Sequence, residues 1–93
     1  MDGVTADRTI HVTLKLYATL GKYLPATAQR ANAVALEVPA SSTMADLVGR
    51  FAVPEAACFL VLVNGVFLPP GARGTARFAE GDTIAIWPPV AGG

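Results

Sequence analysis

Residues 41–51, SSTMADLVGRF, stand apart from the rest of the chain because their apolar side chains are spaced as in a helix. The apolar positions fall at i, i+3, i+4 and i+7, which is one face of an α-helix. They are Met44, Leu47, Val48 and Phe51. The segments before and after this one have the alternating period of strands, so a single helix between strands is the starting point for the fold.

The two ends of this helix also carry local signals. Thr43 is suited to be the N-cap, and Asp46 three residues later suits a capping box, with Asp in place of Glu or Gln. Pro54 is expected to end the helix, because proline disfavours the helical conformation in the residue before it.

Two strands are expected before the helix. Apolar residues alternate with His11, Thr13 and Lys15 from position 10, as in a half-buried strand; they are Ile10, Val12, Leu14 and Leu16. A second alternating run covers residues 34–38 and ends at Pro39. The connection between them contains Gly and Pro and has room for a helical turn, so the two strands can pair as a hairpin.

The chain after the helix predicts three further strands. Residues 58–63, CFLVLV, are apolar at every position, which predicts a strand buried on both faces. Asn64-Gly65 is a strong signal for a type I′ hairpin turn, with a short return over residues 66–68. Residues 69–82 are rich in turn formers, and residues 83–87 alternate again as a last strand with Ile84 and Ile86 on one face.

The order is therefore strand, strand, helix, strand, short strand, strand. This predicts an α+β fold of the ubiquitin-like β-grasp type, a mixed sheet of about four to five strands with one main helix packed on one face. A ferredoxin-like split βαβ fold is the alternative, but it needs a second helix that residues 69–82 do not offer. We expect a flexible tail over residues 1–8, the β-grasp domain over 9–87 and an extended tail over 88–93.

Composition narrows the possible functions. The chain has 93 residues, of which 53% are hydrophobic, and its seven basic and seven acidic residues cancel. No basic block suggests nucleic-acid binding, and the longest apolar run is too short to span a membrane. The only cysteine, Cys58, excludes an internal disulfide, and no Cys/His spacing suggests a metal site. With no signal pattern at the N-terminus, we expect a cytoplasmic protein.

The carboxyl-terminal residues are the strongest candidate site. Pro88 and Pro89 lack N–H donors, so they end the pairing of the last strand and continue as an extended spacer. Gly92 and Gly93 have no side chains, so the terminal carboxylate is unhindered and slim enough for a narrow channel. An enzyme that uses a nucleotide could activate this carboxylate, and a nucleophile could then approach the acyl carbon without meeting a Cβ.

The segment 81–93, GDTIAIWPPVAGG, resembles the carboxyl-terminal signature of the small subunit of molybdopterin synthase, within the family of β-grasp sulfur carriers. Matching residues are those of the Gly-Asp step and of the tail: Gly81, Asp82, Trp87, Pro88, Pro89, Val90, Ala91, Gly92 and Gly93. Asn64 and Gly65 match the VNG hairpin of the family, and LKLYATL is similar to its first strand and exit. The likeness covers most of residues 10–93, and its specific part is the tail.

The resemblance implies a protein cosubstrate rather than an enzyme. A partner of the ubiquitin-activating type would adenylate Gly93 with ATP, and a persulfide donor would supply the sulfur of a thiocarboxylate. The tail would then enter a large synthase subunit and donate sulfur to a pterin precursor. By this likeness Gly93 carries the sulfur, Gly92 gives access, and Trp87 anchors the tail. The threading segment is made of Pro88, Pro89, Val90 and Ala91. No bound cofactor and no metal are implied.

Three departures from the family pattern leave alternatives open. Trp87 replaces the more usual Phe, residues 67–78 are longer and richer in Pro and Gly, and Gly21 stands where many members have a charged residue. Related carriers serve cysteine, thiamine, tungsten-cofactor or tRNA-thiolation routes, and some modify lysines of other proteins. The Pro-Pro-Val step favours the molybdenum branch. A non-catalytic β-grasp binding module is a further alternative.

A surface for docking partners is expected on the sheet face that the helix leaves open. Either Cys58, Leu60 and Leu62 or the alternate set of residues 58–63 must face that side, or loops cover it. The candidates for docking are Phe59, Val61, Val63, Phe67 and Leu68. His11 is expected on the surface, Asp82 in the turn before the last strand, and Cys58 as a buried hydrophobe rather than a sulfur relay.

Overall fold

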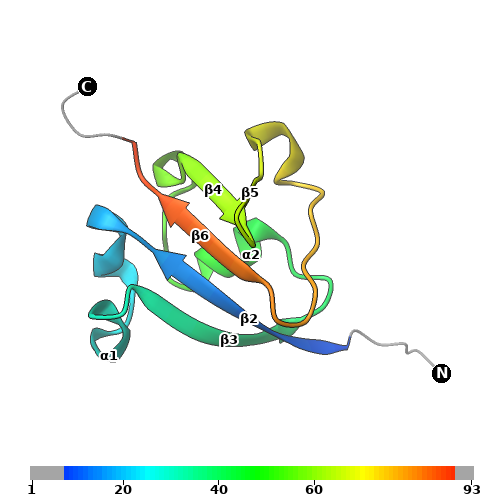
Figure 1. Ribbon diagram of the computed structural model, residues 1–93, viewed down its shortest axis with the longest axis horizontal. Coiled ribbons are helices and arrows are strands. Elements are labelled where there is room, and N and C mark those ends of the chain that lie inside the picture. Colours follow the sequence, from blue (N-terminus) through cyan, green and yellow to red (C-terminus); the bar gives the residue numbers. More distant parts are fainter. Residues whose placement is uncertain (1–7, 90–93) are drawn as a thin grey trace.

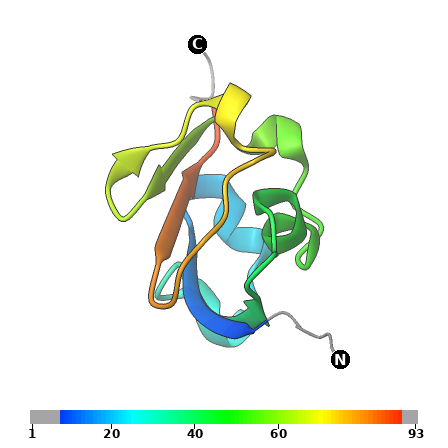
Figure 2. The ribbon, with the colours of Figure 1, turned by 90° about the vertical axis from the view of Figure 1, so that its right-hand side faces the viewer.

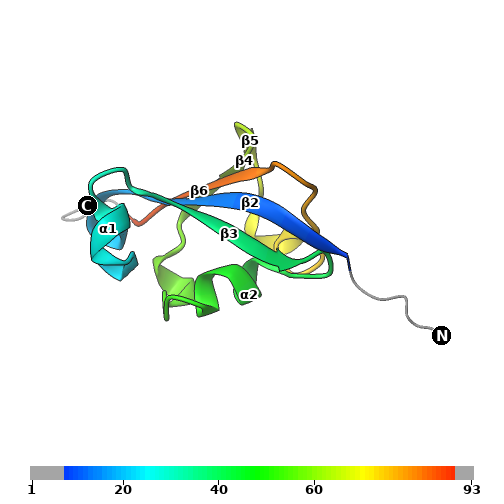
Figure 3. The ribbon, with the colours of Figure 1, turned by 90° about the horizontal axis from the view of Figure 1, so that it is seen from below.

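A computed structural model describes residues 8–89 as a five-stranded mixed sheet with the order β3-β2-β6-β4-β5 (Figure 1). The strands are β2 (Thr9–Leu16), β3 (Ala33–Pro39), β4 (Leu60–Val63), β5 (Val66–Phe67) and β6 (Thr83–Trp87). The main helix, α2 (Met44–Gly49), lies on one face of the sheet (Figure 3). The β-grasp prediction is confirmed.

The pairing of the strands explains how distant segments meet. β2 pairs with β3 antiparallel and with β6 parallel, and β4 pairs antiparallel with both β6 and β5. The first and last strands are therefore central neighbours. Short helical turns fill the connections; they are η1 (Ala18–Tyr23), α1 (Ala26–Gln29), η2 (Glu55–Ala57) and η3 (Pro70–Ala72).

The core lies between α2 and the sheet. The inward residues of the strands alternate with outward ones, as the period of two predicts. The most deeply buried side chains come from four strands, α2 and η1; they are Leu14, Leu16, Leu20, Val38, Leu47, Val48, Val61, Ile84 and Ile86. The sheet face away from α2 is called the outer face below.

The predicted capping box at the start of α2 is present. The Asp46 backbone N–H donates to Thr43 Oγ1 at 3.1 Å, and the Thr43 backbone N–H donates to Asp46 Oδ2 at 2.8 Å. These bonds favour the ionised carboxylate and hold the pKa of Asp46 below its ordinary value. The helix start was thus readable from the sequence.

The end of α2 differs from the prediction. The helix ends at Gly49, and a Schellman-type closure stops it before Pro54 is reached. The Ala52 N–H donates to the Gly49 carbonyl at 3.2 Å, and the Val53 N–H donates to the Val48 carbonyl at 3.1 Å. Ala52 has φ 60°, the left-handed conformation usually filled by glycine. Because alanine occupies this position, no glycine marked the helix end.

The prediction that residues 58–63 form a strand buried on both faces is wrong. β4 begins at Leu60, and only Val61 of its four residues is fully buried. Val61 pairs with buried Ile86, whereas Leu60 pairs with Trp87 and Leu62 with Ala85. Leu60 and Leu62 therefore belong to the outer face and are only half-buried. The physical reason is that α2 covers one face of the sheet only.

The predicted tails over residues 1–8 and 88–93 lie partly inside and partly outside the described residues. The Arg8 carbonyl accepts a bond from the Ala40 N–H at 2.6 Å, so the ordered domain begins at least at residue 8. Residues 1–7 of the predicted amino-terminal tail and residues 90–93 of the predicted carboxyl-terminal tail lie outside the described residues. No helix within residues 8–89 is long and apolar enough to cross a membrane.

Candidate functional site

The base of the carboxyl-terminal tail is Trp87, the last residue of β6. Its carbonyl accepts the Phe59 N–H at 2.9 Å, and the preceding Ile86 carbonyl accepts the Tyr17 N–H at 3.0 Å. The strand ends there, as the two prolines predicted, because Pro88 and Pro89 have no N–H to continue the ladder. The predicted sites Val90, Ala91, Gly92 and Gly93 lie outside the described residues.

Trp87 also has an aromatic partner that the sequence analysis missed. The Tyr17 and Trp87 rings stack with centroids 4.4 Å apart and planes 9° from parallel. Tyr17 directly follows β2, and Leu16 pairs in parallel with Ile86, so Tyr17 and Trp87 occupy matching positions on adjacent strands. The signal in the sequence was an aromatic residue one position after each of two alternating runs, but its meaning depends on the parallel pairing.

An apolar patch spreads from this stack across the outer face. The register places Tyr17, Trp87 and Leu60 in one row, and Ala85, Leu62 and Phe67 in the next, where Lys15 of β2 pairs with Ala85 at the edge of the apolar residues. The apolar residues of the two rows are Tyr17, Leu60, Leu62, Phe67, Ala85 and Trp87. We call these six residues the tail-side patch. The hairpin β4–β5 that carries half of it lies on the opposite side of β6 from α2 (Figure 2). Phe67 is 53% exposed, and Phe59 beside the patch is 63% exposed.

The five docking candidates from the sequence separate into three groups. Phe59 and Phe67 are exposed and available to a partner. Val63 and Leu68 are partly buried and packed against the core. Val61 is 0% exposed, so its assignment to a docking surface is wrong. The alternation along β4 could not be oriented from the sequence, because all six residues of CFLVLV are apolar.

The other signature residues of the sequence lie at the far end of β6 from Trp87. Asn64 Nδ2 donates to Asp82 Oδ1 at 2.8 Å, and the Thr83 N–H donates to Asn64 Oδ1 at 2.9 Å. The second oxygen of Asp82 accepts the Ala79 N–H at 2.9 Å. These bonds join the β4–β5 turn to the start of β6. The expected role of Asp82 in the turn is therefore confirmed, and we call this group the Asn64–Asp82 lock.

Two glycines allow the backbone of the lock to turn. Asn64 and Gly65 both have positive φ, 52° and 84°, as the predicted type I′ turn requires. Gly81 has φ 86°, and its N–H donates to the His11 carbonyl at 2.7 Å. The Gly-Asp and Asn-Gly steps thus have a structural role in the turns that they form.

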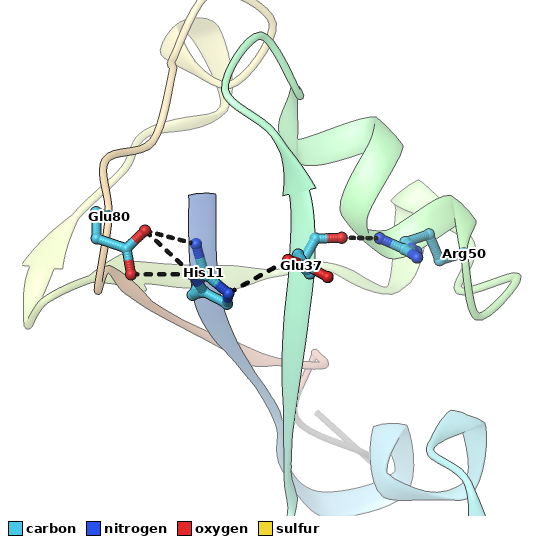
Figure 4. Close-up of polar contacts among 4 residues, drawn as sticks. All are labelled: His11, Glu37, Arg50 and Glu80. Atoms are coloured by element: carbon cyan, nitrogen blue, oxygen red, sulfur yellow. Dashed lines mark hydrogen bonds and ion pairs between the residues drawn. The ribbon is translucent and has the colours of Figure 1, made fainter. Parts of the chain in front are cut away.

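A polar cluster occupies the outer face near the lock (Figure 4). His11 Nδ1 lies 3.2 Å from Glu80 Oε2, and His11 Nε2 lies 3.5 Å from Glu37 Oε2. Glu80 also accepts the His11 backbone N–H at 3.0 Å, and Arg50 donates to the Glu37 carbonyl at 3.2 Å. The bonds from the His11 backbone and ring hold the pKa of Glu80 below its ordinary value. The surface position predicted for His11 is confirmed.

A cavity of about 350 Å³ separates the amino-terminal half of α2 from the loop around η3, and Cys58 lies in its lining. Cys58 is buried, and burial raises the pKa of its thiol despite the nearby Arg73. Arg73 itself donates to the carbonyls of Cys58 at 2.6 Å and Phe59 at 3.0 Å. A thiol with a raised pKa is a poor nucleophile, which agrees with the interpretation of Cys58 as a buried hydrophobe.

Metal chemistry has no candidate site in the described part of the chain. Across residues 8–89, no group of three or more His, Cys, Asp or Glu side chains is arranged to hold a metal ion. The candidate site consists of three parts: the tail base at Trp87, its stack with Tyr17, and the adjoining tail-side patch.

Comparison with known protein families gives a match to the ThiS family over residues 22–93. The chain belongs to the ThiS family. Its members are small β-grasp sulfur carriers that are generally not catalytic. The match includes the lock, the tail base and the terminal glycines, which agrees with the resemblance seen in the sequence.

Among solved structures, the chain is similar to the HVO 2177 protein of Haloferax volcanii, determined in solution. The TM-score is 0.67, the identity is 21%, and the match covers 91% of this chain and 88% of the other. At this identity the likeness shows the fold alone. No curated protein sequence is significantly similar to the chain.

Proposed function

We propose that this ThiS-family chain carries sulfur as a thiocarboxylate on Gly93 and donates it in the synthesis of molybdopterin. The observation that carries the proposal is the sequence Pro-Pro-Val-Ala-Gly-Gly directly after Trp87, the last residue of the last strand of a β-grasp domain. The Pro-Pro-Val step favours the molybdenum branch over the thiamine branch.

The chemistry would take place on the terminal carboxylate. The carboxylate attacks the α-phosphorus of ATP, pyrophosphate leaves, and an acyl-adenylate forms on an activating enzyme. A persulfide sulfur then attacks the acyl carbon, and AMP leaves. A thiol then reduces the resulting acyl disulfide: it forms a disulfide with the donor sulfur and releases the thiocarboxylate. Gly92 and Gly93 lack a Cβ, so none of these steps meets a side chain of these two residues near the reacting carbon.

The domain would supply recognition. The tail-side patch adjoins the base of the tail, and apolar surface beside a reactive terminus is suited to bind the activating enzyme and the large synthase subunit in turn. Within the patch Phe67 is exposed, and Phe59, which directly precedes β4, is exposed as well. Because the same patch would serve both partners, it would bind one at a time. ATP would be bound by the activating enzyme and not by this chain.

Three other functions are alternatives to this proposal. A carrier for cysteine, thiamine, tungsten-cofactor or tRNA thiolation would use the same tail on a different acceptor, and a protein modifier would join it to lysines. A non-catalytic β-grasp binding module would not use the terminal carboxylate at all.

Two changes at the terminus test the proposal. Extension of the chain by two alanines removes the glycine carboxylate, and deletion of Gly93 moves that carboxylate to Gly92, one residue closer to the domain. Neither change alters the sequence of residues 8–89. In a strain that lacks its own molybdopterin-synthase small subunit, the wild-type chain, expressed with its cognate activating enzyme and large subunit, should restore molybdoenzyme activity. Both altered chains should fail to do so.

The control is a chain with Glu37→Gln, which changes the distant polar cluster and should restore activity fully. Restoration by either altered terminus would contradict the carrier proposal and favour the binding module. Restoration of a thiamine-requiring strain instead of the molybdenum-deficient strain would assign the carrier to another pathway.

A further inference from the structure

The stack of Tyr17 on Trp87 lies where the domain ends and the tail begins. We propose that Tyr17 is a positioning residue that sets the direction of the tail through Trp87 and so raises the rate of reaction at Gly93. This inference rests on the proposed carrier function, which it deepens.

The first argument is that no flexible residue separates the stack from the stiff spacer. Trp87 is followed at once by Pro88 and Pro89. Proline restricts the residue before it to extended conformations and has its own φ nearly constant. The orientation of Trp87 is therefore passed directly to the first two residues of the tail.

The second argument is that Trp87 is held on both sides. Its carbonyl accepts the N–H of Phe59, which directly precedes β4, and its ring is stacked by Tyr17, which directly follows β2. Leu60 lies in the same row on the other side of Trp87. The backbone bond alone would leave the indole ring free to change rotamer, so the Tyr17 ring supplies the missing constraint.

The third argument comes from the backbone after Tyr17. Ala18 has φ 53°, a left-handed conformation that is unfavourable for a residue with a Cβ. The chain turns there into η1, whose Leu20 is buried in the core. This turn ends β2 at the level where β6 ends and keeps the Tyr17 ring over Trp87. A strained residue beside a working element is a recurrent feature of functional sites.

The test separates positioning from simple docking. The activating enzyme, ATP, a persulfide donor and a thiol are mixed with the wild-type chain, Tyr17→Ala, Tyr17→Phe or Phe67→Ala, and the rate of AMP release is measured at varied carrier concentration. If the interaction free energy of a stacked aromatic pair is lost from the transition state, kcat should fall roughly three- to tenfold in Tyr17→Ala. KM should change less than kcat, and Tyr17→Phe should keep wild-type kcat because it keeps the stacked ring.

Phe67→Ala is the matched control within the same patch. Phe67 is exposed and belongs to the second row, away from Trp87, so this change should raise KM and leave kcat unchanged. The fluorescence of Trp87, the only tryptophan in the chain, reports the stack directly. Its anisotropy should fall in Tyr17→Ala alone, while circular dichroism confirms that every variant is folded.

Two outcomes would contradict different claims. If the wild-type chain turns over and Tyr17→Ala has the same kcat, or only a raised KM, Tyr17 is not a positioning residue and the carrier function stands. If the wild-type chain itself is never adenylated, the proposed function fails, and with it the role of Tyr17 in it.

Discussion

The two ends of the outer sheet face differ in polarity, since one end carries a polar cluster and the other an apolar patch. At the end near the lock, His11 lies between Glu37 and Glu80, and each polar group has a partner within the domain. At the end near the tail, the stack of Tyr17 and Trp87 continues into the apolar side chains of the tail-side patch, of which Phe67 is 53% exposed. The first surface is polar and paired within the domain, and the second is apolar and partly open to solvent.

This contrast separates structural from functional residues within one sequence signature. Asn64 and Asp82 belong to the motif of the family, yet their contacts serve only to join the hairpin to β6. Trp87 belongs to the same motif and is both a strand residue and the base of the tail. Changes at the two ends should therefore affect different measurements, stability at one and partner chemistry at the other.

The largest effect is expected from a charge placed in the tail-side patch. Phe67→Asp should weaken binding of the activating enzyme by roughly 30- to 100-fold, because a truncated interface anchor typically costs about 2 kcal/mol or more. Phe67 is half exposed, so the free energy of unfolding should change little. Calorimetric titration measures the affinity, with Glu37→Gln as the control at the polar end. Equal losses from both variants would refute the contrast between the two ends.

A smaller effect, on stability rather than on partner binding, is expected at the Asn64–Asp82 lock. Asp82→Ala removes the acceptors for Asn64 Nδ2 and the Ala79 N–H, and the free energy of unfolding should fall by about 1–3 kcal/mol. Urea denaturation measures the change. Below the unfolding temperature, the folded variant should still be adenylated at the wild-type rate. A folded Asp82→Ala chain with slow adenylation would show that the lock takes part in the tail chemistry.

A gain in stability is expected at the turn after Tyr17. Ala18→Gly should stabilise the fold by up to about 1 kcal/mol. Glycine removes a left-handed strain of roughly 1–2 kcal/mol, and the greater conformational entropy that it loses on folding costs about 0.5–1 kcal/mol. The matched control is Ala26→Gly in α1, where no strain is present and the change should destabilise. Thermal unfolding of both variants gives the answer; shifts of the same sign would mean that Ala18 is not strained.

The smallest effect concerns the pH dependence of stability at the polar end. The pKa of Glu80 is lowered in the fold by the bonds from His11. A lowered pKa contributes stability above the ordinary value, and that contribution is lost as the pH falls through the folded pKa. Glu80→Gln should therefore be less stable than wild type above the ordinary value of 4.5, and the difference should vanish as the pH falls through the folded pKa. Denaturation midpoints between neutral and acidic pH measure this, and a difference that appears only at acidic pH would contradict it.

The sequence predicted what depends on neighbouring residues. The helix with its capping box, the alternating strands and the Asn64–Gly65 turn all follow from local spacing, and the tail follows from its own residue types. The contacts that were missed depend on pairing between distant segments. Tyr17 reaches Trp87 only because β2 and β6 are parallel neighbours.

Two local predictions failed for physical reasons that can be named. Val61 was assigned to the docking surface because a run of six apolar residues has no alternation to orient it, and only the register with Ile86 places it in the core. The end of α2 was assigned to Pro54 because the left-handed residue that closes the helix is Ala52 and not a glycine. The first outcome depends on pairing across the sheet, and the second on a local backbone closure in which alanine takes the place of the usual glycine.

The mass of the intact chain is the measurement to make first on the proposed carrier. The chain is incubated with ATP, its activating enzyme and a persulfide donor with a thiol, and is then digested and analysed by mass spectrometry. We predict a gain equal to the exchange of one oxygen for one sulfur, confined to the peptide that ends in Gly93. An unchanged mass, while the same mixture converts a known sulfur carrier, would contradict the proposal that this chain carries sulfur on its terminal glycine.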